Sequence, residues 1–344
     1  MIGTDINRTD FHNPRNGFPN GPLGATNPYN PADTSFAIGS GGVFKGNDTR
    51  DVTIDQWSVF MDDQLSLTKQ LKAVLGLRYD QFDTQWKYTT PATVTKTSNT
   101  YEFVSFRLGG VYDITPTLTT YASYGSAVEP GGVILLLNST QSQLDLTTAR
   151  QAEAGIKQSF WDGKGELTAA IYEITKKNVF VSDPNNSQNR LPIGQQSSKG
   201  IELGLGLRPT TEWQIDANIA ATRARYDDYR TGVPPVDFSG NQPTFVPDYV
   251  ANLGLRYMPT SDLSFSTWIR HVDGFYANDA NTIKLPAYTT VDLAADYKLN
   301  KIANLGFRVR NLTDEFYATF GSSNGRQAII AAPRTFEVSV NLRY

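Results

Sequence analysis

Hydrophobic and polar residues alternate one by one along most of the chain. In the last twelve residues, every second position is apolar or aromatic: Phe336, Val338, Val340, Leu342 and Tyr344. Successive side chains of an extended strand point to opposite faces, so such a segment has one apolar and one polar face. The 3.6-residue period of an amphipathic helix is hard to find, and the pattern therefore predicts an all-β protein.

About thirteen segments with this pattern, each of roughly 10 to 16 residues, follow one another along the sequence. Strands of soluble sandwiches usually have about five or six residues, whereas strands of this length can cross a bilayer at a tilt. We expect strands near residues 52–66, 70–88, 101–114, 117–128, 146–160, 165–182, 196–208, 212–226, 248–258, 262–275, 286–299, 303–313 and 334–344.

The connections between these segments are alternately short and long. The short links are turn-forming pairs or triplets such as Thr115-Pro116 and Asp162-Gly163, and the long polar loops lie near residues 89–100, 129–145, 183–195, 227–247, 276–285 and 314–333. Outer-membrane barrels have short periplasmic turns and long extracellular loops. The pattern predicts an antiparallel up-and-down transmembrane β-barrel with its apolar side chains facing lipid.

Composition narrows the function classes. The 344 residues carry a net charge of −3, no Cys and only two His, His12 and His271. The balanced charge argues against nucleic acid as a partner, and the residue counts argue against thiol chemistry and a zinc centre. No group of residues has the pattern of a catalytic site, so we expect no enzyme. The longest aliphatic run, Val133 to Leu137, is far shorter than the roughly 20 residues of a membrane helix, and we expect it to pack against neighbouring loops, a plug or a partner.

Several stretches resemble the C-terminal barrel of TonB-dependent outer-membrane receptors, and the ferric-siderophore branch in particular. They are "DQWSVFMDDQLSLTKQLKAVLGLRYD", "YASYGSAVEPGG", "ARQAEAGIKQSFWDGKGELTAAIYEITKKNVFVSDP", "SSKGIELGLGLRP", "LPAYTTVDLAADYKL", "VRNLTDEFYATFG" and "PRTFEVSVNLRY". These stretches occur in family order from about Asp51 to Tyr344. The family resemblance implies a barrel of about 22 strands that is filled by an N-terminal plug domain.

Nothing in the sequence resembles that plug or a TonB box. Counting back from the last strand assigns the segments to about the tenth to the twenty-second strand of the family barrel. We therefore expect residues 1–50 to be an extracellular loop or linker and residues 51–344 to be the C-terminal part of the barrel. If Ser35 to Gly46 adds a strand, about fourteen strands could instead close as a smaller barrel.

Two sets of side chains are candidates for contact with a transported ligand. Charged residues on the polar faces are expected to face the lumen, either lining a polar path or paired in the wall against a plug: Arg78, Asp80, Arg107, Lys157, Glu202, Arg270, Arg308 and Arg343. Rings and one cation in the long loops could hold an aromatic or hydroxamate chelate, or else pack the loops together: Tyr229, Phe238, Phe245, Phe275, Tyr276, Phe316, Phe320 and Arg326.

The resemblance implies an outer-membrane receptor that takes up a ferric siderophore. The iron would be carried by the siderophore, so no cofactor is expected. The TonB–ExbB–ExbD system would act only through a plug. The family also implies that the terminal strand, with Phe336, Val338, Val340, Leu342 and Tyr344, is an insertion signal for the barrel assembly machinery. Two alternatives stay open: a small outer-membrane pore or structural barrel with passive diffusion, and a soluble carbohydrate-binding β-protein.

Overall fold

The computed structural model describes residues 1–16, 47–90, 92–129, 144–183, 186–232, 234–323 and 325–342. All elements in these ranges are β-strands, and fourteen of them pair in one sheet in the order in which they occur in the chain. Within the described ranges, no helix has the length and apolar character needed to cross a membrane.

The strands of the large sheet are β1 (Ile2–Asn16), β2 (Asn47–Ser66), β3 (Leu71–Thr89), β4 (Val94–Thr115), β5 (Leu118–Glu129), β6 (Thr147–Phe160), β7 (Gly165–Asp183), β8 (Asn186–Leu207), β9 (Trp213–Asp228), β12 (Tyr249–Tyr257), β13 (Leu263–Val272), β16 (Tyr288–Lys298), β17 (Ala303–Arg310) and β20 (Thr335–Leu342). The pairs β1–β2, β4–β5, β5–β6, β6–β7, β7–β8, β8–β9, β9–β12, β12–β13, β13–β16, β16–β17 and β17–β20 are antiparallel. Three two-stranded sheets lie in the long loops: β10 (Arg230–Thr231) with β11 (Val236–Asp237), β14 (Phe275–Tyr276) with β15 (Lys284–Leu285), and β18 (Ala318–Gly321) with β19 (Ala328–Ile330).

The thirteen predicted strands correspond to β2 through β9, β12, β13, β16, β17 and β20. The expectation of a loop or linker over residues 1–50 was wrong for Ile2–Asn16, which form β1 in register with β2. Because polar residues occupy both faces of this segment, its sequence lacks the alternation of apolar and polar residues from which the other strands were predicted. The possible extra strand, Ser35 to Gly46, lies outside the described residues.

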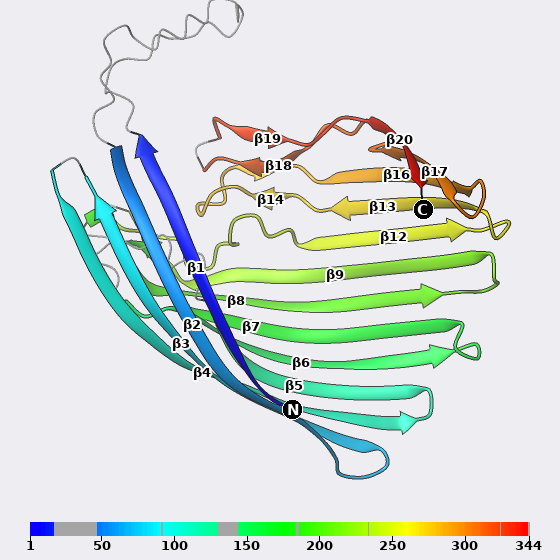
Figure 1. Cartoon of the computed structure of the whole chain (residues 1–344), viewed down its shortest axis with the longest axis horizontal. Coiled ribbons are helices and arrows are strands. Elements are labelled where there is room, and N and C mark those ends of the chain that lie inside the picture. The colour runs from blue at the N-terminus through cyan, green and yellow to red at the C-terminus, as the bar shows by residue number, and fades with distance from the viewer. Residues whose placement is uncertain are drawn as a thin grey trace, which may run out of the picture. The chain divides into compact units, whose positions relative to one another are not determined.

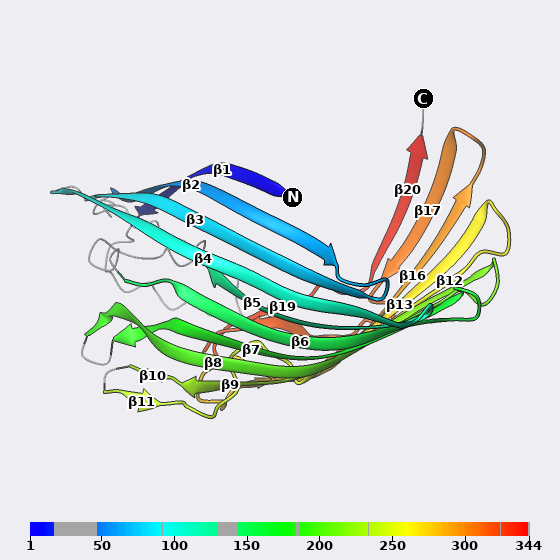
Figure 2. The same cartoon turned by 90° about the horizontal axis from the view of Figure 1, so that it is seen from below.

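The chain forms two compact units. Unit 1 comprises residues 1–61, 78–104 and 130–144, and unit 2 comprises residues 62–77, 105–129 and 145–344. In unit 2, strands β5 to β9 lie side by side in chain order (Figure 1). The β10–β11 hairpin extends beyond the end of β9 (Figure 2).

Unit 1 has its own small hydrophobic core. Val52, Phe82, Trp86 and Tyr101 are each less than 9% exposed. Along β3, the odd-numbered residues are apolar up to residue 79 and polar from 81 to 87, while the even-numbered residues 82, 84 and 86 are buried. The apolar and polar faces of β3 are therefore exchanged near Tyr79.

In unit 2, one face of the sheet is apolar and exposed. Ile171 pairs with Ile201, and Ile201 pairs with Ala221, so these side chains lie in one row on that face. Ile171 is 59% exposed and Ile201 is 54% exposed. We call this side of the sheet the apolar face and the opposite side the polar face. Such exposure is the arrangement of a lipid-facing barrel surface.

Aromatic rings on the polar face lie over glycines of neighbouring strands. A Cβ atom on Gly155 would lie 2.7 Å from the ring of Tyr121, and one on Gly200 would lie 2.5 Å from the ring of Tyr172. These glycines are required because any larger residue would displace the ring that covers it.

Four of the short turns share one hydrogen-bonding pattern. A Thr or Asn side-chain oxygen at the start of the turn accepts backbone N–H groups from two and three residues later, as in an ST or Asx turn. The residues that do so are Thr68, Thr115, Thr260 and Asn300. The Thr or Asn residues of these four links thus stabilise the tight turns of their hairpins.

Candidate ligand site

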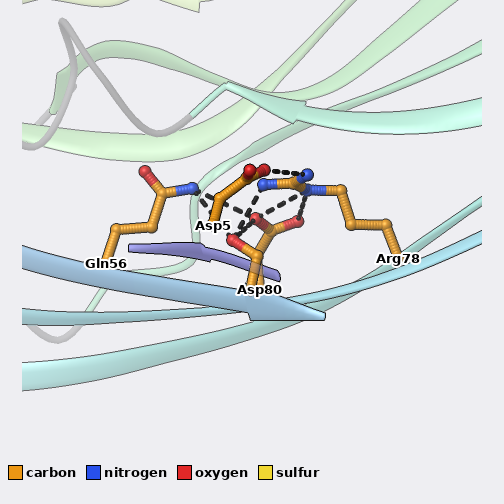
Figure 3. Close-up of polar contacts among 5 residues, drawn as sticks. Asp5, Gln56, Arg78 and Asp80 are labelled. Carbon is orange, nitrogen blue, oxygen red and sulfur yellow. Dashed lines mark hydrogen bonds and ion pairs between the residues drawn. The ribbon is translucent and has the colours of Figure 1, made fainter. Parts of the chain in front are cut away.

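Unit 1 carries a connected group of hydrogen bonds around Arg78 (Figure 3). The Arg78 Nε atom donates to both oxygens of Asp80, at 2.9 and 3.0 Å, and its Nη1 atom donates to Asp5 at 2.7 Å. Ser58 and Gln56 also donate to Asp80, which is 5% exposed. Arg78 and Asp80 therefore form an ion pair with each other. A place in a polar path or in a wall packed against a plug stays a prediction for both residues.

The remaining charged candidates within the described residues lie on the polar face of unit 2. Lys157 forms an ion pair with Glu166 at 2.9 Å, and Arg308 lies 3.6 Å from Asp296. Within the described ranges, no ion pair involves Arg107, Glu202 or Arg270. Arg343 lies outside the described residues. Whether these side chains line a path in the membrane remains a prediction.

A groove of about 510 Å³ surrounds Arg270 and Trp268 on the polar face. The Trp268 indole lies over Gly254, where a Cβ atom would be 3.5 Å from its Cδ1. Arg270 donates to Asn252 at 3.0 Å, and Asn252 donates to Asn218 at 2.8 Å. Arg256 and three carboxylates, those of Asp216, Asp292 and Asp296, also line the groove. It therefore combines an exposed indole, amide groups and charges of both signs.

Two stacked rings lie next to this groove. Tyr288, at the start of β16, stacks on Tyr317 from a long loop with ring centroids 3.9 Å apart. The pKa of Tyr317 is raised by burial and by the negative potential of Tyr288 and Asp292, and the nearby charge of Arg270 opposes the rise. Arg270 was a predicted candidate, and it thus lies near a pair of aromatic rings, Tyr288 and Tyr317, that were not predicted as candidates.

A second groove, of about 560 Å³, lies at the short-turn end of the sheet. It is lined by turn residues such as Pro259 and Ser261. Because it is at the opposite end from the long loops and their rings, we regard the groove at Arg270 as the better candidate for a ligand site.

The loops after β9 and β13 are tied together by side-chain hydrogen bonds. Tyr226 is 4% exposed and donates from its hydroxyl to Asp279 at 2.7 Å. Gln242 and Asn281 form a reciprocal pair: the Gln242 N–H donates to the Asn281 side chain at 2.8 Å, and the Asn281 amide donates to the Gln242 carbonyl at 2.9 Å. Burial and the Asp279 carboxylate raise the pKa of Tyr226 well above its ordinary range.

Three of the predicted loop aromatics meet in one cluster. Phe245 stacks on Phe320 at a centroid distance of 5.0 Å and meets Phe275 edge-on at 6.1 Å. Phe245 has a φ of 62°, a left-handed conformation that is uncommon for a bulky residue, and its N–H donates to the Tyr276 carbonyl at 2.9 Å. Phe245 and Phe320 are 39% and 42% exposed, so each ring keeps one open side.

The other loop candidates have contacts and exposures of their own. Tyr229 stacks on Tyr226 at 3.9 Å, and the Phe238 N–H donates to the Tyr229 carbonyl. Tyr276 lies beneath the Lys284 ammonium at 5.7 Å. Phe316 is 80% exposed, and Arg326 is also exposed. Their roles in binding remain predictions.

Sequence reasoning missed the residues that hold the loops in place. Tyr226 was counted as the end of a strand, and Asp279 as one more polar loop residue. Trp268 stands between a polar residue, Thr267, and an apolar one, Ile269, so alternation alone does not assign it to a face. Counting every second residue from Ser266 places Trp268 on the polar face with Arg270, and this count needs only the sequence.

The terminal strand presents its predicted apolar row on the apolar face. Phe336, Val338, Val340 and Leu342 are 59 to 75% exposed. Tyr344 lies outside the described residues, as does the run Val133 to Leu137. A role as an insertion signal remains a prediction.

Comparison with known proteins identifies the family. The family described as "TonB dependent receptor-like, beta-barrel" matches residues 2–312. The chain belongs to this family. Its all-β fold is that of the family's barrel.

Individual relatives of this TonB-dependent receptor chain support the same assignment. The probable TonB-dependent siderophore receptor PiuA of Acinetobacter baumannii is 28% identical over 86% of this chain and 41% of its own length. The ferrichrome outer membrane transporter and phage receptor of Escherichia coli is 26% identical over 90% of this chain and 42% of its own length. The chain therefore spans less than half the length of these curated relatives.

Solved structures agree with this fold. The crystal structure of PiuA superimposes with a TM-score of 0.77 over 86% of this chain and 44% of that chain, at 28% identity. The ferric-catecholate import receptor Fiu from E. coli superimposes with a TM-score of 0.72 over 87% of this chain and 46% of that chain, at 18% identity. The expected fold class and outer-membrane location are confirmed, and the family consists of receptors rather than enzymes.

Proposed function

We propose that this chain is barrel wall and loop structure of an outer-membrane receptor for ferric siderophores. The names of PiuA and of the ferrichrome transporter support this substrate class. In the complete receptor, we propose that a plug domain coupled to TonB, ExbB and ExbD gates entry. The siderophore would hold the iron, and the protein would contact only the organic chelate.

The observation that carries the proposal is the groove at Arg270. Within the described residues, Arg270 makes no ion pair, although Asp216, Asp292 and Asp296 also line the groove. Trp268 lies in the same lining, and the stacked rings of Tyr288 and Tyr317 lie nearby. A ferric chelate presents oxygen donors with negative charge and, in many cases, flat aromatic or hydroxamate groups. Charge-assisted hydrogen bonds and stacking are the two interactions that this site offers to such a ligand.

Binding of ferric complexes to the purified protein in detergent tests the proposal. A hydroxamate and a catecholate complex are titrated while quenching of tryptophan fluorescence is recorded, since Trp268 lies in the groove. Arg270→Gln is expected to weaken binding of the preferred complex by about tenfold or more, the loss of one charged hydrogen bond. Phe265→Ala, on the apolar face and 46% exposed, serves as the matched control and should bind as the unaltered protein does.

The alternative of a passive pore makes a different prediction. If the protein is a simple channel, planar bilayers containing it will conduct steadily, and neither ferric complex will quench its fluorescence. That pair of results would contradict the receptor proposal.

A further inference from the structure

A hollow of about 530 Å³ lies on the polar face over three neighbouring strands, β4, β5 and β6 (Figure 2). Val74 of β3 and Ile174 of β7 bound it on its two sides. Its floor consists of small residues, Gly109, Ser123 and Gly125, and the atoms nearest to a Cβ placed on either glycine are not ring atoms. The hollow is open because no ring covers these glycines, in contrast to the other glycines of this face.

Two opposite charges line this hollow, and they do not pair with each other. Within the described residues, Arg107 of β4 makes neither an ion pair nor a side-chain hydrogen bond, although the Asp62 carboxylate lies near its Cβ atom. Glu153 of β6 accepts hydrogen bonds from the Tyr121 hydroxyl at 2.6 Å and from the Gln151 amide at 2.9 Å. Both of these donors are neutral, so neither charge is balanced by an ion pair.

The register of the strands places β5 between the two charges. Arg107 pairs with Gly125, Gly125 pairs with Gln151, and Glu153 is the next residue of β6 on the same face. Two strand spacings of about 4.8 Å and one step of about 6.7 Å along β6 place the Cα atoms of Arg107 and Glu153 about 12 Å apart. The third charged residue of the lining, Arg150, belongs to the opposite face by alternation. The polar side of the hollow thus has one guanidinium and one carboxylate over an uncharged floor.

This arrangement suits a ligand that carries both charges. An anion alone would bind Arg107 but would face the Glu153 carboxylate, and a cation alone would meet the opposite conflict. A molecule with a carboxylate at one end and an ammonium at the other satisfies both residues with charge-assisted hydrogen bonds. Val111 and Ala127 also line the hollow and offer apolar contact to a short methylene chain between the two ends.

We propose that this hollow binds a small zwitterion with a carboxylate and a primary ammonium at opposite ends. The Arg107 guanidinium donates to the ligand carboxylate, and the ligand ammonium donates to Glu153. The methylene chain lies over the floor of small residues, beside Val111 and Ile174. The site is on other strands than the groove at Arg270, needs no iron, and does not depend on the proposed uptake of a ferric siderophore.

Thermal melting of the purified full chain in uncharged micelles tests this site. The probe 6-aminohexanoate is expected to raise the melting temperature at concentrations where hexanoate and hexylammonium do not. Arg107→Gln and Glu153→Gln should each need about tenfold more 6-aminohexanoate for the same shift, because each variant loses one charge-assisted hydrogen bond to the ligand. Arg208→Gln and Asp162→Asn remove the same charges at the short-turn end, outside the hollow, and should respond as the unaltered chain does.

Four outcomes would overturn the proposal. An equal shift from hexanoate would mean that the hollow binds anions alone, and an equal shift from hexylammonium would mean that it binds cations alone. The absence of any shift with 6-aminohexanoate, or an unchanged response of both variants, would mean that these residues hold no zwitterion. Melting without ligand separates lost binding from lost folding. Arg107→Gln removes no ion pair, and Glu153→Gln keeps an oxygen acceptor for the Tyr121 hydroxyl, so both are expected to melt close to the unaltered chain.

Discussion

At the scale of single residues, the hydrogen bond from Tyr226 to Asp279 decides how two long loops lie. The hydroxyl is buried and has a carboxylate as its acceptor, so deleting it would leave Asp279 with one fewer strong donor. Leaving a buried polar group unsatisfied costs about 1 to 3 kcal/mol. This bond supports the placement of Phe245 and Phe275, which belong to the same two loops.

Removing that hydroxyl should loosen the loops in a pH-dependent manner. The folded-state pKa of Tyr226 is raised above the ordinary 10.0, so folding favours the neutral phenol. Its stabilising contribution is complete below pH 10.0 and is lost as the pH rises toward the folded-state pKa. Cleavage of residues 229–248 by a protease should therefore accelerate above about pH 10 in the unaltered protein.

At pH 8, Tyr226→Phe is expected to be cleaved faster than the unaltered protein. Because the variant has no phenol at this position to ionise, it should not show the acceleration above about pH 10 that ionisation of Tyr226 causes in the unaltered protein. Tyr297→Phe, on the apolar face and 46% exposed, is the control. Identical cleavage profiles for Tyr226→Phe and the unaltered protein would show that the bond does not hold the loops.

At the scale of strands, rings lying on glycines connect neighbouring elements of the polar face. Tyr172 of β7 covers Gly200 of β8 and reaches Thr222 of β9, whose hydroxyl is 2.8 Å from the Tyr172 hydroxyl. One ring thus spans three strands. This geometry explains why glycines occur in the middle of strands where they otherwise weaken a sheet.

A methyl group at Gly200 should be costly for that reason. Gly200→Ala is expected to destabilise the protein by about 1 to 3 kcal/mol, because the ring or the backbone must move. Gly110→Ala, where no atom lies within 4 Å of the added Cβ, should have little effect on thermal unfolding in detergent. Combining Gly200→Ala with Tyr172→Ala should cost less than the sum of the two changes; strict additivity would contradict the contact.

Strand positions were predictable from sequence because alternation, turn residues and loop lengths are local signals. The loop rings were predictable as a group, yet only Phe245, Phe275 and Phe320 meet, because their meeting depends on contacts between loops far apart in the chain. β1 was not predicted, since its polar residues on both faces resemble a loop. The placement of Arg107 and Glu153 around one hollow likewise depends on register, which alternation alone does not fix.

At the scale of the whole molecule, the ligand proposal depends on one arrangement in the membrane. The long loops with their rings are placed outside the cell, the Thr and Asn turns in the periplasm, and the apolar face between them in lipid. The reverse orientation would place the rings of the long loops on the periplasmic side, away from an incoming ligand.

Labelling of single cysteines in intact Gram-negative cells tests this arrangement most directly, because the chain has no Cys of its own. With a membrane-impermeant maleimide, Ser239→Cys and Ala280→Cys in the loops should be labelled in intact cells. Asp162→Cys and Ser261→Cys in the turns should be labelled only after the outer membrane is disrupted, and Leu203→Cys on the apolar face should stay protected while lipid is present. Labelling of the turn positions in intact cells, with the loop positions protected, would contradict the account.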